Sequence, residues 1–148
     1  MDMRFSITLP REAYTVAVMR EFLGEALRTG GLCDECVFKI LLAASEACTN
    51  AVDHGAPAPD YEVVARVDEH SCVLEIAHKG QEFTGAGVPL PELEAESGRG
   101  ILLMRQLMED VAFTGAEEGN TIVRLCKRLH ENEPPENGRG TSPTVVLC

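Results

Sequence analysis

The stretch AASEACTNAVDHG, residues 43–55, decides the fold. It belongs to a segment that begins near Asp34, in which apolar residues recur every three or four positions, as on one face of a helix. These residues are Val37, Ile40, Leu41, Ala44, Ala47, Cys48 and Ala51. Glu46, Asn50 and His54 are four positions apart and form a second, polar stripe on the same helix. Carboxylate and carboxamide oxygens one turn apart suit a divalent cation, although a solvated helix face is the commoner explanation of such a stripe.

Composition narrows the class of protein. The chain of 148 residues has 45% hydrophobic residues, which is typical of one globular domain. No apolar run approaches the roughly 20 residues that a membrane-spanning helix needs. The N-terminus lacks the basic and apolar regions of a secretory signal. We therefore expect a cytoplasmic protein without a membrane partner.

The formal net charge of −11 opposes direct binding to nucleic acid, whose phosphates are also negative. No cluster of lysine and arginine offsets this charge locally. An acidic surface suits a basic protein partner, but solubility alone is the commoner explanation of such a charge.

Six cysteines are present without the context of a secreted disulfide framework. Cys48, Cys72 and Cys126 lie in apolar surroundings and are expected to be small buried residues. Cys33 and Cys36 form a CxxC motif, which could be redox-active or half of a zinc site. No second CxxC completes four zinc ligands, so we expect a structural role, with a thiol-based redox sensor as the alternative.

The other elements follow from alternation, helical periodicity and the positions of glycine and proline. Pro10 is expected at the first position of a helix and Gly55 at a C-cap. The expected order is a strand over 4–9, helices over 11–29 and 34–54, strands over 61–68 and 71–78, a helix over 98–108, and strands over 110–114 and 121–125. This order predicts an α+β fold: a two-layer α/β sandwich with a mixed, mainly antiparallel sheet covered on one face by helices.

Two glycine-rich regions separate these elements. Residues 79–97 contain several glycines and prolines and are predicted to form a lid over a ligand. The sequence Ser97-Gly98-Arg99-Gly100 opens the next helix, where backbone amides and the helix dipole favour an anion. A plain tight turn explains the second region as well when it is taken alone. We expect residues 1–130 to form the domain and residues 131–148 a disordered tail.

A magnesium nucleotide needs three features together. They are the polar stripe with Glu46 and Asn50, the predicted lid and the anion-binding start of the next helix. The run from Glu46 to His54 resembles the N-box of the GHKL ATPases, the superfamily of gyrase, Hsp90, histidine kinases and MutL. Two motifs resemble those of one branch, the anti-sigma factor serine/threonine kinases. They are Ser-Glu-Ala-x-Thr-Asn-Ala and Gly98-Arg99-Gly100-Ile101. The resemblance covers about residues 4–129 and implies the Bergerat (histidine-kinase-like ATPase) fold.

The resemblance implies binding of ATP and Mg²⁺ and assigns roles to residues of the two motifs. Asn50 would coordinate the magnesium ion that bridges the ATP phosphates. Glu46 would act as the catalytic general base on an incoming serine hydroxyl. Gly98, Arg99 and Gly100 would hold the phosphates through backbone amides and a cation.

The resemblance also places the adenine end of the pocket. Thr121 matches a threonine that helps to recognise adenine. The family's first glycine box is Asp-x-Gly-x-Gly, whereas this chain has His78-Lys79-Gly80-Gln81-Glu82. His78 and Gly80 would therefore still line the nucleotide, but His78 replaces the aspartate that accepts from the adenine amino group, and Glu82 replaces a glycine.

The resemblance further implies protein partners. Members of the branch sequester a sigma factor and phosphorylate a serine of an anti-anti-sigma protein, often as a homodimer whose first helix contacts partners. Arg20 lies on that helix and is a candidate contact residue. The alternative is a binding module of the same fold that sequesters a partner with little or no catalysis, because His78 and Glu82 degrade the adenine site.

Overall fold

The computed structural model describes residues 2–55, 58–79, 100–115 and 120–129. Its elements are β1 (Met3–Pro10), α1 (Thr15–Thr29), α2 (Asp34–His54), β2 (Asp60–Val67), β3 (Ser71–Lys79), a helix over residues 100–107, β4 (Asp110–Gly115) and β5 (Asn120–Arg128). The predicted lid, apart from Lys79, and the predicted tail and its boundary at residue 130 lie outside the described residues. No helix among the described residues is long and apolar enough to cross a membrane.

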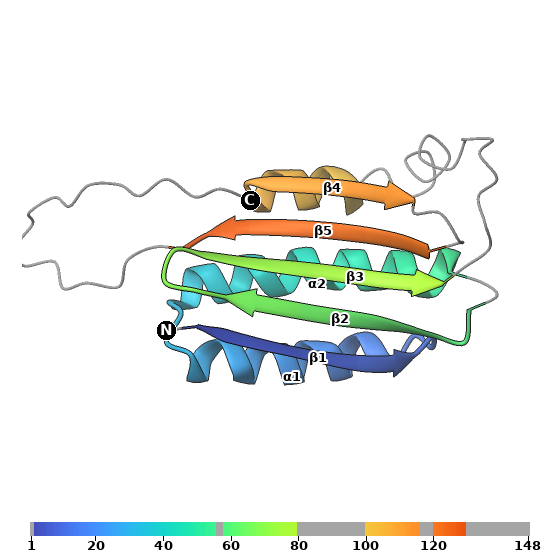
Figure 1. The fold of residues 1–148 in the computed structure, drawn as a ribbon, viewed down its shortest axis with the longest axis horizontal. Coiled ribbons are helices and arrows are strands. Elements are labelled where there is room, and N and C mark those ends of the chain that lie inside the picture. Colours follow the sequence, from blue (N-terminus) through green and yellow to red (C-terminus); the bar gives the residue numbers. More distant parts are fainter. Residues whose placement is uncertain (1, 56–57, 80–99, 116–119, 130–148) are drawn as a thin grey trace, which may run out of the picture.

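The strands form one sheet in the order β1-β2-β3-β5-β4. All helices lie against one face of this sheet, which gives two layers (Figure 1). The predicted α+β sandwich is thus confirmed. The sheet is less mixed than expected, because every pair of neighbouring described strands is antiparallel.

The core lies between the two layers. Alternate residues of the strands face the helices, as period-two patterning predicts, and α2 contributes mainly small side chains. The buried members on β2, β3 and α2 are Tyr61, Val63, Ala65, Val67, Cys72, Leu74, Ile76, Cys36, Val37, Ile40, Ala43, Ala44, Ala47, Cys48 and Ala51. Cys48, Cys72 and Cys126 are each at most 1% exposed, so the prediction that they are buried is confirmed.

The first helix begins later than the sequence suggests. We predicted a start at Arg11 with Pro10 as the first helical residue, but α1 starts at Thr15. Pro10 instead pairs with Asp60 at the end of β1, and the Arg11 backbone N–H donates to Pro59 O at 2.9 Å. These contacts are distant in sequence, so local helix signals could not reveal them.

The two helix ends use glycine for different reasons. Gly31, after α1, has a φ of 92°, in the left-handed region that favours glycine, and its N–H donates to Arg28 O. Gly55 occupies the predicted C-cap of α2, but its φ of −90° is available to any residue. The requirement for glycine at residue 55 therefore comes from close packing, which is described below.

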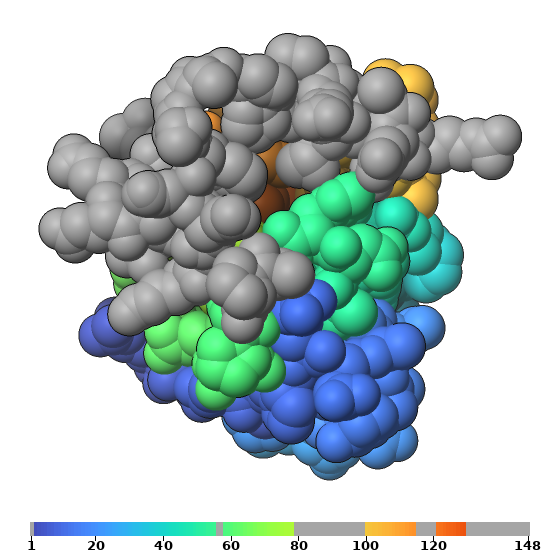
Figure 2. All heavy atoms as spheres, turned by 90° about the vertical axis from the view of Figure 1, so that its right-hand side faces the viewer, coloured from blue at the N-terminus to red at the C-terminus, as the bar shows by residue number. Residues whose placement is uncertain are grey.

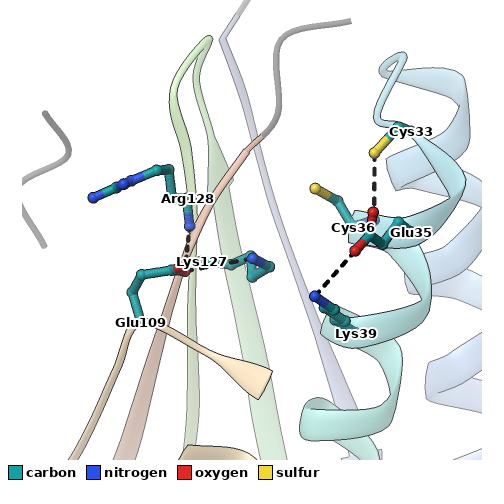
Figure 3. Close-up of polar contacts among 7 residues, drawn as sticks. All are labelled: Cys33, Glu35, Cys36, Lys39, Glu109, Lys127 and Arg128. Carbon is teal, nitrogen blue, oxygen red and sulfur yellow. Dashed lines mark hydrogen bonds and ion pairs between the residues drawn. The ribbon is translucent and has the colours of Figure 1, made fainter. Parts of the chain in front are cut away.

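The last strand extends past its predicted end at Leu125, through Lys127 and Arg128. Two consecutive basic residues look like a strand end, yet Lys127 is only 4% exposed. Its Nζ lies 3.5 Å from Glu109 Oε1, which also accepts from the Arg128 backbone N–H at 2.7 Å (Figure 3). The neighbouring carboxylate compensates the buried ammonium, which allows the strand to continue.

A buried polar contact joins the start of α1 to the sheet. The hydroxyl of Tyr61, which is 1% exposed, lies 2.8 Å from Thr15 Oγ1. Thr15 Oγ1 also lies within donating distance of the carbonyls of Pro10 and Glu12, at 2.9 and 2.7 Å. Burial raises the pKa of Tyr61 to about 12, against the opposing effect of the Thr15 hydrogen bond. The phenol therefore stays protonated and can donate to Thr15.

Replacement of Thr15 by valine should destabilise the fold. The substitution keeps the shape but removes the Thr15 hydroxyl, which leaves the Cys48 thiol as the remaining side-chain partner of the buried Tyr61 hydroxyl and costs about 0.5–1.5 kcal/mol of unfolding free energy. Urea denaturation followed by circular dichroism measures this loss. Thr8→Val, at an exposed position of β1, is the matched control and should change stability by less than about 0.5 kcal/mol. Equal stability of the two variants would contradict a structural role for the contact.

Candidate functional site

The polar stripe of α2 lies at the end of the molecule where β3 ends and β5 begins (Figure 1). Asn50 is 8% exposed, so it is a buried residue and not part of a solvated face. Ala47 and Ala51, on the same helix, are also buried. Figure 2 views the molecule from this end and shows the last turns of α2 beside the N-terminal segment and the segment 100–115.

Glu46 lies against the first described residue of the helix over 100–107. A Cβ atom built on Gly100 would be 2.7 Å from Glu46 Oε1, closer than real Cβ contacts allow. The carboxylate is half-buried in this position. Glu46 and Gly100, which are far apart in sequence, are thus brought together, and the absence of a side chain at residue 100 allows the close approach.

Three polar side-chain atoms at this end are buried and have no hydrogen-bond partner among the described residues. They are Asn50 Nδ2, His78 Nδ1 and Thr121 Oγ1. Buried polar atoms are nearly always satisfied, so a group of unsatisfied ones indicates a site for a ligand. His78 and Thr121 are direct partners in the β3–β5 register, which places both on neighbouring strands at the same level.

His78 lies against the C-terminal end of α2. A Cβ built on Gly55 would clash with the backbone oxygen of Ala51 on the same helix and would lie 3.1 Å from Arg11 Cδ and 3.3 Å from His78 Nδ1, so residue 55 has no room for a side chain. Burial lowers the pKa of His78, and the positive charges of Arg11 and His54 lower it further. The imidazole is therefore neutral at physiological pH. A neutral ring can present an acceptor nitrogen, which a protonated ring cannot.

Arg11 belongs to this region, and sequence reasoning missed it. Its Nε donates to Ala58 O at 2.7 Å, and its Nη1 donates to Val52 O at 2.6 Å. The guanidinium thus ties the end of α2 to the segment that precedes β2. The predicted helix start at Arg11 gave no indication of this role, because both acceptors are more than 40 residues away.

The structure says less about the other residues that were predicted to belong to the site or to contact partners. Gly80, Glu82, Gly98 and Arg99 lie outside the described residues. Arg20 is exposed on α1. His54 is in the last turn of α2, where a cation suits the helix dipole, and its effect on the pKa of His78 places it near that ring.

The site residues fit a magnesium nucleotide better than a permanently bound ion. The described residues contain no group of three His, Cys, Asp or Glu side chains that could hold a metal. Mg²⁺ commonly takes only one or two protein ligands and completes its shell with phosphate oxygens and water. Asn50 can supply one such ligand through Oδ1, and its unsatisfied Nδ2 can donate to a phosphate oxygen.

Cys33 and Cys36 lie at the opposite end of α2. Cys33 is the N-cap, and its Sγ accepts from the Cys36 backbone N–H at 3.4 Å. Cys36 is 1% exposed, and Figure 3 shows its sulfur directed from α2 toward the sheet. Neither cysteine forms a disulfide bond. The predicted structural role of the CxxC motif is therefore specific: Cys33 caps the start of α2.

Comparison with known proteins agrees with this geometry. The sequence matches the histidine kinase-like ATPase domain over residues 9–127. The chain belongs to this family. The predicted resemblance to the GHKL superfamily is thereby confirmed.

Curated relatives cover most of the chain. It is 32% identical over 143 residues to an anti-sigma F factor of Bacillus velezensis, across 90% of this chain and 94% of that protein. It is 34% identical over 131 residues to the serine-protein kinase RsbW of Bacillus pumilus, across 78% of this chain and 80% of that protein.

Solved structures show the same fold at lower identity. The RsbU and RsbW domains of a Mycobacterium tuberculosis protein superpose with a TM-score of 0.67 at 21% identity, over 86% of this chain and 32% of that longer chain. The SiaB–SiaC complex of Pseudomonas aeruginosa contains a chain with a TM-score of 0.62 at 14% identity, over 82% of this chain and 88% of that one.

Substitution of Cys33 separates a capping role from a redox role. Cys33→Ala removes the acceptor at the N-cap and should lower the unfolding free energy by about 0.5–2 kcal/mol. Cys33→Ser should be at least as stable as the natural chain, because serine is a preferred N-cap residue. Urea denaturation under reducing conditions measures both. A loss with serine as large as with alanine would contradict the capping role.

Proposed function

We propose that this protein is an ATP-dependent serine/threonine kinase that acts as an anti-sigma factor. It sequesters a sigma factor and phosphorylates an anti-anti-sigma protein. The main support is the approach of Glu46 to Gly100, one helical turn from the buried, unsatisfied amide of Asn50. Anti-sigma F factors and serine-protein kinases among the relatives also support it.

Each described residue has a separate task in this proposal. When bound, ATP supplies the phosphoryl group, and its phosphates complete the shell of Mg²⁺. Asn50 would hold that magnesium through Oδ1, and its Nδ2 is free to donate to a phosphate oxygen. Glu46 accepts the proton of the attacking serine hydroxyl, a role that typically contributes about 10²–10⁴-fold to rate.

The helix over residues 100–107 has the anion-binding role in this proposal. Backbone amides at the start of a helix favour negative charge. Gly98, Arg99 and Gly100 hold the phosphates there, and Gly100 also leaves room for the Glu46 carboxylate. His78, Gly80 and Thr121 line the base at the other end of the pocket.

The protein partners belong to the same proposal. The names of the relatives point to a sigma factor, and a kinase of this branch needs an anti-anti-sigma protein as its substrate. We further propose a homodimer, with Arg20 on the exposed face of α1 as a contact to a partner. A net charge of −11 suits a basic surface on that partner.

Substitutions of the two α2 residues should have different effects. Asn50→Ala should abolish Mg-ATP binding in calorimetric titration, because it removes the proposed protein ligand of the metal. Glu46→Gln should keep ATP binding and lower phosphoryl transfer to a partner serine by about 10²–10⁴-fold, because glutamine cannot accept the proton.

The control for both is Glu25→Gln, at an exposed position of α1. Absence of Mg-ATP binding to the natural chain at millimolar nucleotide would contradict the kinase and would favour the binding module without catalysis. Unchanged transfer by Glu46→Gln would instead show that the base is a different group.

A methyl group at residue 100 should impair catalysis without weakening the fold. In Gly100→Ala the new Cβ displaces the Glu46 carboxylate, whose flexible end can move away at little cost. Transfer should fall by at least about tenfold, while the urea midpoint stays the same or rises, because alanine favours a helix. Gln106→Ala, exposed on the same helix, is the control. Full activity of Gly100→Ala would rule out this packing requirement.

A further inference from the structure

His78 and Thr121 form an unsatisfied polar pair that the phosphate chemistry does not use. They face each other in the β3–β5 register, and His78 Nδ1 and Thr121 Oγ1 are both buried without a hydrogen-bond partner among the described residues. Thr121 is followed on its strand by the buried residues Val123 and Leu125, which face the same way. The two polar atoms therefore lie on the helix side of the sheet, at the end where α2 carries Asn50.

We propose that His78 and Thr121 read the edge of the nucleotide base and allow the pocket to accept guanine as well as adenine. The inference rests on the proposed nucleotide-binding function and deepens it, because it concerns which purine the same pocket takes. His78 is thereby the residue that determines base specificity.

The hydrogen-bonding capacity of the two side chains is the basis of this inference. A neutral imidazole carries one donor and one acceptor nitrogen and can exchange them by changing its tautomer, and a hydroxyl can also do either. Adenine presents an amino group where guanine presents a carbonyl oxygen. A carboxylate at this position could only accept, so it would favour the amino group and oppose the carbonyl oxygen. His78 and Thr121 can satisfy both bases.

The surroundings of His78 predict how the relative affinity for ATP and GTP changes with pH. Arg11 faces the ring from the β1–α1 connection and His54 faces it from α2, while the facing side chain on β5, Thr121, does not titrate. Burial and these charges hold the pKa of His78 below its ordinary 6.5, so the ring is neutral above that value. Protonation at lower pH removes the acceptor but keeps the donors. Acidification should therefore weaken ATP binding more than GTP binding.

Calorimetric titration of the full chain with Mg-ATP and Mg-GTP tests the inference. For the natural chain at about pH 8, the two affinities should differ by less than about tenfold, because each base finds a partner. As the pH is lowered through the pKa of His78, which lies below its ordinary 6.5, the ratio of ATP to GTP affinity should fall by several-fold. His78→Asp should raise that ratio at pH of about 8 by roughly tenfold or more, because the carboxylate cannot donate to the guanine carbonyl.

Two further variants isolate the cause. His78→Asn keeps one donor and one acceptor but does not titrate, so it should retain the mixed preference and lose the pH dependence. His70→Asp, at the exposed β2–β3 turn, adds the same charge away from the pocket and should behave like the natural chain. Circular dichroism of each variant checks that the fold is intact.

The possible outcomes are distinguishable. If the natural chain binds ATP at least a hundredfold more tightly than GTP, or if His78→Asp leaves the ratio unchanged, the inference is wrong and the proposed kinase stands. If only His78→Asp binds nucleotide, the pair does not recognise a base. If neither chain binds ATP or GTP, both the inference and the proposed function fail.

Discussion

The close packing of α2 on the sheet is the constraint on which the rest of the structure depends. The helix can lie near β3 and β5 because its buried face carries alanine and cysteine, including Ala44, Ala47 and Cys48. Larger side chains there would move the helix away from the sheet, since protein interiors have no spare volume. The short distance also brings Asn50 to the ends of the strands, where its amide is buried. The same small residues therefore build the core and position the site.

The two ends of this packed layer differ in whether their buried polar groups have hydrogen-bond partners. Near the start of α2, Cys33 caps the helix, and across the core Thr15 satisfies Tyr61. At the other end Asn50, His78 and Thr121 retain buried atoms without partners. Elsewhere among the described residues, Arg124 Nε also lacks a hydrogen-bond partner, but it lies 3.7 Å from Glu75 Oε2, whereas the three atoms at this end have no such charged neighbour in common. Their concentration is better explained by a ligand that supplies the missing partners.

The sequence predicted those features of the fold and the site that depend on local patterns. The three- and four-residue spacing from Val37 to Ala51 predicted α2, and the spacing of Glu46 and Asn50 predicted the polar stripe, of which the fold buries Asn50 and leaves Glu46 half-buried. The start of α1, the contacts of Arg11 and the burial of Lys127 could not be predicted, because each depends on residues distant in sequence. Gly55 combines both cases. Its position at the helix end was predictable, whereas the contacts with Arg11 and His78, which add to the local contact with Ala51 O, arise only in the folded chain.

The fold itself does not require histidine at residue 78. Burial lowers the pKa of the ring, and Arg11 and His54 lower it further, so the surroundings oppose a protonated histidine. Arg11 already donates to the carbonyls of Val52 and Ala58, so it does not depend on residue 78 for its position. For an aspartate at this position, the charge of Arg11 would offset part of the cost of burying the carboxylate. Because the surroundings would accept the residue that the wider family uses, the reason for histidine is to be sought in what the pocket binds.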